Sequence, residues 1–143
     1  MEMVDISGKE ETLREAEAFG EVILSGEVMR AIKDGRVPKG DVMEAARLAG
    51  IMGAKKTSEL IPLCHPIPID HISVDLEPGG NSIKIRVKVK VKGKTGAEME
   101  AMVGVAITAL TIYDMIKGLD MGARIERIRL GRKRGGKSGE VVL

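Results

Sequence analysis

The chain has 143 residues, of which 43% are hydrophobic and 31% are charged, and its formal net charge is +2. This length predicts one domain, residues 1–143, built around a single core. No apolar run approaches the roughly 18 residues of a membrane-spanning helix, and the acidic N-terminal region lacks the apolar segment of a signal peptide. A single cysteine, Cys64, excludes an intrachain disulfide and agrees with a reducing compartment. We therefore expect a cytoplasmic protein.

The charges are distributed unevenly along the chain. Residues 1–21 carry seven acids against two cations, whereas residues 124–137 carry seven cations against one acid. The C-terminal region is therefore expected to attract anions. Phe19 and Tyr113 are the only aromatic residues, so the base-stacking platforms of single-strand nucleic-acid binders are missing. The expected partner is a small polyanion, and neither nucleic acid nor a membrane is expected.

The first part of the chain predicts an arm, a strand and two helices. Residues 1–14 are polar and weakly patterned, which indicates a mobile arm, and residues 15–24 favour a strand. Ser25 is placed to cap a short helix. Asp41 then begins a longer helix with an apolar face rich in small residues, which we expect to reach residue 59 or 60.

The second part of the chain predicts a hairpin, a long helix and a last strand. Prolines at positions 62, 66 and 68 exclude a helix from that segment. Residues 72–76 and 83–91 alternate apolar and polar side chains around a Pro-Gly-Gly-Asn turn, which predicts an antiparallel hairpin with one cationic face. A solvated surface explains those cations better than a ligand site does. Residues 97–119 have helical apolar spacing, and residues 124–130 favour a strand.

The resulting order of elements is β-α-α-β-β-α-β. It predicts an α+β protein with the ferredoxin-like split βαβ arrangement, in which the helices cover one face of an antiparallel sheet. No internal repeat and no linker interrupts this order.

The segment Gly131–Ser138 matches the phosphate-binding pattern G-x-x-x-x-G-K-[ST]. In a P-loop this turn joins a buried strand to a long helix, whose N-terminal N–H groups hold the phosphates. Only Gly139, Glu140, Val141, Val142 and Leu143 follow Ser138, which leaves no room for such a helix. We therefore expect a terminal loop that binds anions through its cationic side chains, and not a P-loop.

The long apolar helix carries charges at both ends. Glu98 and Glu100 lie in its first turn, and Asp114 and Lys117 lie near its end. Acids at the start and a cation at the end complement the helix dipole, so ordinary helix electrostatics explains most of this pattern. Asp114 is the exception, because a carboxylate there faces the negative end of the dipole. Its pair with Lys117 is either a compensating ion pair or an acid/base device.

Cys64 and His65 lie in the proline-rich loop. With His71 they form at most a marginal ligand set without the spacing of a metal site, so no metal is expected. A rigid loop that presents His65 and backbone N–H groups to a ligand fits better. Several cations elsewhere in the chain also suit an anionic ligand, namely Arg14, Lys39, Lys55, Lys56, Lys133, Arg134 and Lys137.

Three long blocks, AKKTSELIPLCHPIPI, GKTGAEMEAMVGVAITALTIYDMIKGLD and KRGGKSG, resemble the cyclic pyranopterin monophosphate synthase (MoaC) family of molybdenum cofactor biosynthesis. The segments MVDIS and PKGDV are also similar to that family, so the resemblance extends from Met3 to Gly139. The chain departs from the family pattern at Arg134, where a small residue is usual, and in its short C-terminal tail.

The resemblance implies a lyase that converts 3′,8-cyclo-7,8-dihydroguanosine 5′-triphosphate to cyclic pyranopterin monophosphate with release of pyrophosphate. It implies a ferredoxin-like subunit and a homohexamer, assembled as a trimer of dimers with active sites at the dimer interface. No cofactor is expected. Mg²⁺ is compatible with a triphosphate, although the sequence shows no dedicated cluster of ligands for it.

By motif position, the resemblance implies catalytic roles for Asp114, Lys117 and Lys39 and substrate contacts by two segments, Leu63-Cys64-His65 and Met99-Glu100. Side-chain chemistry agrees with these roles. A carboxylate at Glu98 or Glu100 can accept hydrogen bonds from a guanine-type base, and a partly buried lysine can transfer protons. The side chains suited to neutralising the triphosphate are Arg14, Lys55, His65, Lys133 and Lys137.

The spacing of two of these residues has a geometric consequence. Glu100 and Asp114 lie 14 residues apart, which corresponds to about 21 Å along a straight helix. Both cannot line one small pocket from one helix, so a shared substrate requires the helix start of one subunit and the helix end of another.

Two other functions compete with catalysis. A nucleotide-binding module without activity would use the same cations but would not need Asp114 or Lys117. A nucleic-acid binder would use the hairpin lysines and the basic C-terminal region, but the scarcity of aromatic residues disfavours this function.

Overall fold

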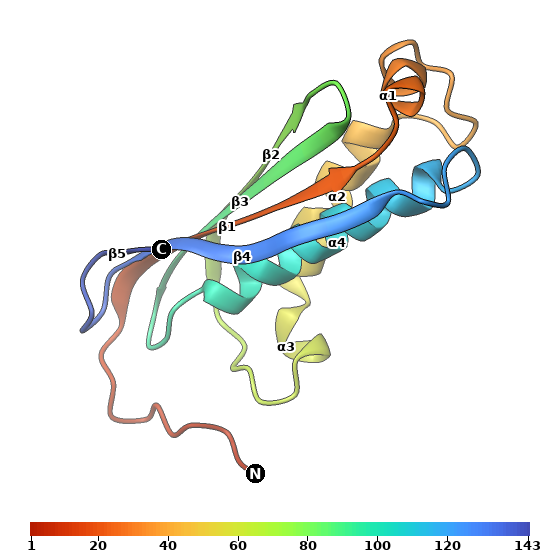
Figure 1. Ribbon diagram of the computed structural model, residues 1–143. Coiled ribbons are helices and arrows are strands. Elements are labelled where there is room, and N and C mark those ends of the chain that lie inside the picture. The colour runs from red at the N-terminus through yellow and green to blue at the C-terminus, as the bar shows by residue number, and fades with distance from the viewer.

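The computed structural model describes residues 1–143 as an antiparallel sheet with helices on one side (Figure 1). An N-terminal arm, residues 1–11, precedes the first strand and contains neither helix nor strand. The elements in chain order are β1 (Thr12–Ile23), α1 (Gly26–Lys33), α2 (Val42–Lys55), α3 (Thr57–Leu60), β2 (Ile69–Pro78), β3 (Ser82–Gly93), α4 (Glu98–Ile116), β4 (Arg124–Arg134) and β5 (Val141–Val142).

The sheet has the strand order β2-β3-β1-β4-β5, and every neighbouring pair is antiparallel. Strands β1 and β3 lie at the centre and pair along their whole length, from Thr12 opposite Gly93 to Ile23 opposite Ser82. Helices α2 and α4 lie together against one face of the sheet (Figure 1). This arrangement confirms the predicted ferredoxin-like α+β fold, with β5 added at one edge.

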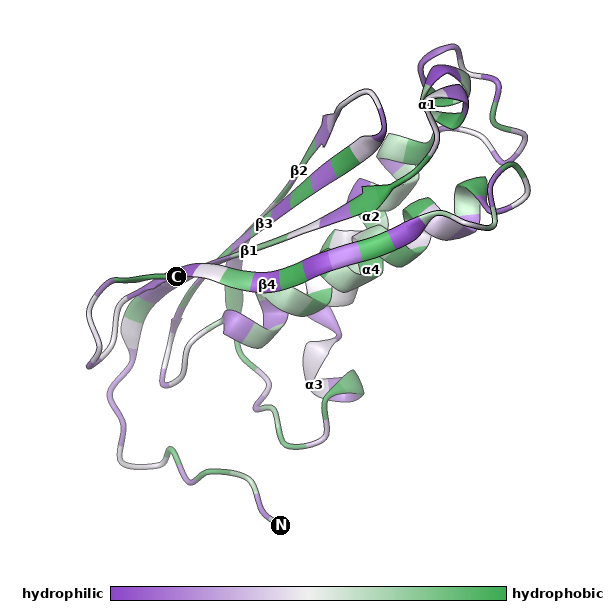
Figure 2. Cartoon of the chain, viewed as in Figure 1, coloured by the Kyte–Doolittle hydropathy of each residue, from purple (hydrophilic) through white to green (hydrophobic).

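The core lies between the sheet and these helices. The β3 side chains Ile83, Ile85, Val87, Val89 and Val91 are almost fully buried, as the period-two pattern predicts. Figure 2 shows the alternation of apolar and polar residues along β3. Helix α4 is long and apolar enough to cross a membrane by length and composition alone, and its inner residues form part of this core.

Helices α2 and α4 approach each other closely at two glycines of α2. A side chain at Gly50 would overlap the Thr108 hydroxyl, and one at Gly53 would come within 2.6 Å of Ile107 Cγ1. Gly104 of α4 lies close to the sheet, because a side chain there would come within 2.9 Å of Val87 Cγ1 on β3. The small residues of α2 therefore let the two helices pack tightly over the sheet.

The face of the sheet opposite the helices carries paired charges. The carboxylates of Glu15 and Glu17 on β1 are buried under cations from the two neighbouring strands. Arg86 donates to Glu17 at 2.9 Å, and Lys90 lies 3.3 Å from Glu15, which also accepts from Arg134. The cationic face predicted for the hairpin is therefore ion-paired with β1, and is more than a solvated surface.

Several element boundaries differ from the sequence-based prediction, and the long helix, predicted to reach residue 119, ends at Ile116. The second helix ends at Lys55 instead of continuing to residue 59 or 60, because the chain turns at Lys56 and starts a separate short helix, α3. The buried Thr57 hydroxyl donates to the Ala54 carbonyl at this turn. The first strand begins at Thr12, earlier than residue 15, and the last predicted strand continues to Arg134. Half of the expected terminal loop is therefore strand.

Candidate functional site

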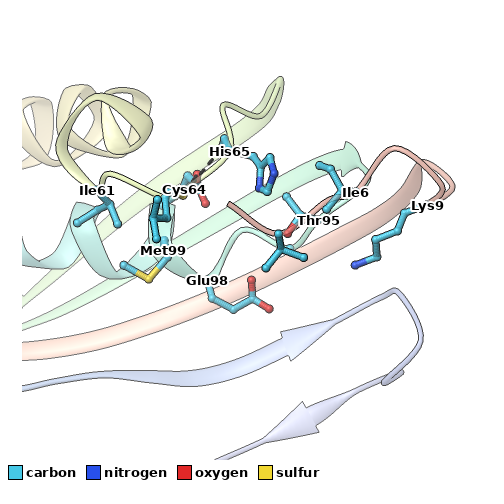
Figure 3. A pocket seen from close by; sticks show the side chains of 12 residues that line it. Ile6, Lys9, Ile61, Cys64, His65, Thr95, Glu98 and Met99 are labelled. Carbon is cyan, nitrogen blue, oxygen red and sulfur yellow. Dashed lines mark hydrogen bonds between the residues drawn. The ribbon is translucent and has the colours of Figure 1, made fainter. Parts of the chain in front are cut away.

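The first residues of α4, the loop after α3 and the N-terminal arm enclose a pocket of about 370 Å³, here called the α4 pocket. Leu63, Cys64 and His65 come from the loop, and Glu98, Met99 and Glu100 come from the helix. Figure 3 shows these segments converging on one space, with Ile6 and Lys9 of the arm on its far side. The structure thus brings together six of the substrate-binding residues that the sequence predicted.

Glu100 is the buried acid of the α4 pocket, with only 3% of its surface exposed. The Cys64 thiol donates to Glu100 Oε2 over 3.7 Å, and this is the only side-chain donor to the carboxylate. Burial raises the pKa of Glu100, and burial together with the nearby carboxylate raises the pKa of Cys64 to about 11. Because a buried acceptor without strong donors is costly, Glu100 is suited to accept hydrogen bonds from a ligand.

Glu98 links the α4 pocket to strand β4. Lys133 Nζ lies 3.1 Å from Glu98 Oε1, and both side chains are about two-thirds buried. The neighbouring Gly96 has no space for a side chain, because a Cβ there would overlap the Glu98 carboxylate. Glu98 is therefore held against β4, whereas Glu100 is buried in the lining of the α4 pocket beside Cys64.

A second pocket, of about 350 Å³ and without hydrophobic residues, adjoins the first and is here called the cationic pocket. It is lined by Lys9, Arg14 and Lys137, and Lys9 also lines the α4 pocket. Arg14 is fixed by two backbone carbonyls, Gly93 O at 3.0 Å from Nε and Lys94 O at 3.3 Å from Nη2. Gly136, with φ +76°, lies against the Arg14 guanidinium where a side chain would overlap it.

The other end of α4 holds a separate group of charges. Asp114 accepts from Lys39 Nζ at 3.1 Å through Oδ2 and lies 3.2 Å from Lys117 Nζ through Oδ1. Lys39 also donates to the Asp114 backbone carbonyl at 2.9 Å. Hydrogen bonds from Lys39 and Lys117 lower the pKa of Asp114. All three side chains are about half exposed, so this group lies on the surface of the protein.

The candidate residues therefore fall into two sets at opposite ends of one helix. One set surrounds the α4 pocket and the cationic pocket, and the other is Lys39, Asp114 and Lys117. Lys55 joins neither set: it lines a third cavity, of about 500 Å³, together with Asp70 and His71. No group of three His, Cys, Asp or Glu side chains is placed to hold a metal ion. The P-loop pattern is followed by strand β5 and not by a helix.

Two features of the site were not predicted from the sequence. Lys9, Thr12 and Thr95 line the pockets, but only the resemblance of the MVDIS and GKTG blocks pointed to their neighbourhoods. The contact of Lys39 with Asp114 joins residues 75 positions apart, and no local pattern reveals it. The sequence indicated Lys117 alone as the partner of Asp114.

Known proteins are similar to this chain over nearly its whole length. The model of the MoaC family matches residues 3–136. A cyclic pyranopterin monophosphate synthase of Novosphingobium aromaticivorans is 52% identical over 137 residues, which cover 96% of this chain and 87% of that protein. The synthase of Chloroflexus aurantiacus is 51% identical over 140 residues (96% and 86%), and that of Trichodesmium erythraeum is 50% identical over 145 residues (100% and 87%). Because the family model covers most of the chain and these relatives are about half identical over nearly its whole length, the chain belongs to the MoaC family.

Proposed function

We propose that this protein is a cyclic pyranopterin monophosphate synthase of molybdenum cofactor biosynthesis. It is a lyase that converts 3′,8-cyclo-7,8-dihydroguanosine 5′-triphosphate to cyclic pyranopterin monophosphate and releases pyrophosphate. The names of the relatives support the activity. The single structural observation that supports the proposed site is the division of its charged residues between two ends of α4, with a base-sized pocket and cations at one end and an acid–lysine group at the other.

At the first end, the two pockets bind two chemically different parts of the substrate, the base and the triphosphate. The α4 pocket offers buried Glu100 as an acceptor for N–H groups of the base, and Met99 and Leu63 as apolar walls. The adjoining cationic pocket offers Arg14 and Lys137 to the triphosphate. Hydrogen bonds between such cations and phosphate oxygens are stronger than those between neutral groups. Lys9, which borders both pockets, is a further cation for the phosphates.

At the second end, Asp114 and two lysines form the proposed catalytic group. The Asp114 carboxylate holds both ammonium groups within 3.2 Å, so the lysines are positioned relative to each other before substrate arrives. Ring rearrangement requires protons to be removed and returned at different atoms, and two adjacent lysines can divide these tasks.

The two ends belong to one site only if two subunits meet. About 21 Å of helix separates Glu100 from Asp114, so we propose that a substrate bound at the first end of one protomer meets the catalytic group of its partner. We propose a twofold dimer as the minimal active unit, assembled into a cytoplasmic homohexamer.

The test is pyrophosphate release from the cyclic dihydroguanosine triphosphate, with GTP as the control substrate. We expect release from the cyclic nucleotide only, and loss of release on Asp114→Asn with binding of the cyclic nucleotide retained. Asp34→Asn is the matched control, because Asp34 is also an exposed acid in an ion pair but lies in neither set. Equal turnover by Asp114→Asn and Asp34→Asn would refute the catalytic assignment. Binding of the cyclic nucleotide without any turnover by the unmodified protein would favour a binding module.

A further inference from the structure

One buried polar atom in this protein has no hydrogen-bond partner, the hydroxyl oxygen of Thr12 at the start of β1. Other shielded threonine hydroxyls are satisfied: that of Thr57 donates to the Ala54 carbonyl and that of Thr108 to the Gly104 carbonyl, at 2.8 and 2.7 Å. A buried hydroxyl without a partner destabilises the folded state, because the group has lost its water. Such a group calls for an explanation, and an absent ligand is one.

The surroundings of Thr12 indicate the chemistry of that ligand. Thr12 lines the cationic pocket with Lys9, Arg14 and Lys137. None of these three cations has an ion-pair partner in the protein, although most of the acids on the neighbouring sheet face do. Glu10 is the only acid that lines the pocket. The pocket lining thus combines three cations without ion-pair partners, one hydroxyl without a hydrogen-bond partner and a single acid. This combination favours a ligand with several negative charges and many acceptor oxygens.

We propose that the Thr12 hydroxyl binds the polyphosphate part of the substrate and then the departing pyrophosphate. The identity of the phosphate compound rests on the proposed function. The argument for an anion-binding site does not, because it depends only on the unpaired hydroxyl and the cations. A threonine hydroxyl donates one hydrogen bond, and a phosphate oxygen accepts it without competing for a protein donor. The Thr12 hydrogen bond thereby orients the ligand in the pocket, whereas the lysines act as point charges and orient it less.

The position of Thr12 fits this role. Its backbone pairs with Gly93 in the sheet, so the residue is anchored by the central strand pair and not by a loop. Rotation about its Cα–Cβ bond exchanges the hydroxyl with the methyl group, which turns the hydroxyl towards a ligand without movement of the backbone. The pocket lining also includes Gly8, Lys9 and Glu10 of the N-terminal arm, which contains neither helix nor strand.

The test measures binding of inorganic pyrophosphate and inorganic triphosphate by calorimetry, together with thermal unfolding without ligand. Thr12→Val keeps the shape and removes the hydroxyl, and Thr12→Ser keeps the hydroxyl. We expect Thr12→Val to weaken binding of both anions about tenfold and to leave the unliganded protein as stable as before or more stable. Thr12→Ser should bind within about twofold of the unmodified protein, a change far below tenfold.

Thr111→Val is the matched control, because its hydroxyl donates to the Ile107 carbonyl on α4 and does not line the pocket. It should leave anion binding unchanged. Unchanged pyrophosphate binding by Thr12→Val, or no binding by the unmodified protein, would overturn the proposal even if the enzyme is active. Thr12-dependent anion binding in a protein that releases no pyrophosphate would instead uphold the site and refute the proposed function.

Discussion

The separation of Glu100 from Asp114 makes a quantitative prediction about mixed subunits. Glu100→Gln removes the charge of the buried acid while keeping its size, and Asp114→Asn does the same at the other end of α4. Each homodimer of one variant then carries the same defect in both of its sites. In a mixed dimer with two shared sites, one site collects both substitutions and the other collects none.

The expected recovery follows from counting. Random association of equal amounts of the two variants gives mixed dimers as about half of all dimers, and each has one intact site of two, so activity should return to about one quarter of that of the unmodified protein. The distance requires this result: about 21 Å of helix cannot bring the two residues of one subunit to one substrate. If each site belonged to a single subunit, mixing would restore nothing.

The assay is pyrophosphate release after the two variants are unfolded together, refolded and checked for mixed dimers by native mass spectrometry. A mixture of Asp114→Asn and Lys117→Ala serves as the control, because both substitutions lie at the same end of α4 and every site should remain defective. Absence of recovery in a sample with proven mixed dimers, or equal recovery in the control mixture, would refute shared sites.

Three further predictions concern the fold and the environment of the site. Gly50→Ala should lower the free energy of unfolding in urea by about 1–3 kcal/mol, since its Cβ overlaps the Thr108 hydroxyl, whereas Gly118→Ala, which meets nothing within 4 Å, should not; equal effects would contradict the close packing of α2 and α4. Hydrogen bonding to Arg86 lowers the pKa of Glu17, so its stabilisation is present above the unfolded pKa of about 4.3 and is lost as pH falls through the folded value. Glu17→Gln should therefore lose less stability between pH 7 and pH 3 than the unmodified protein in urea titrations, and an identical loss would exclude a role for this ion pair. Because burial raises the pKa of Cys64 to about 11, iodoacetamide at pH 8 should modify it about 100-fold more slowly than an ordinary thiol; labelling at the ordinary rate would show that the thiol is accessible and unperturbed.

Local patterns predicted the elements well where one physical effect dominates. Ser25 and Asp41 cap α1 and α2 as expected, each accepting from a backbone N–H three residues later at 3.1 Å. Local patterns could not predict that α2 ends at Lys55, because the helical spacing of apolar residues continues through the following residues. The chain turns there through tertiary packing, which buries Thr57 almost completely.

The site was predictable in its residue types but not in its assembly. Sequence blocks pointed to Glu100, His65 and Asp114, yet Lys39 reaches Asp114 only through the fold. Lys55 appeared to be one more cation for the phosphates, and the structure places it in a different cavity, beside Asp70 and His71. Charge type can be read from the sequence, whereas which cations share a pocket depends on how α2, α4 and the sheet are packed.

The length of α4 constrains how this protein can evolve. The helix carries one part of the proposed site at its first turn and the other at its last, so every residue between them sets both a distance and an angle. Insertion or deletion of a single residue would move Asp114 by about 1.5 Å along the axis and turn it by about 100° relative to Glu100. Substitutions can accumulate on the exposed side of α4, but changes in its length should be rejected even when the altered helix remains stable.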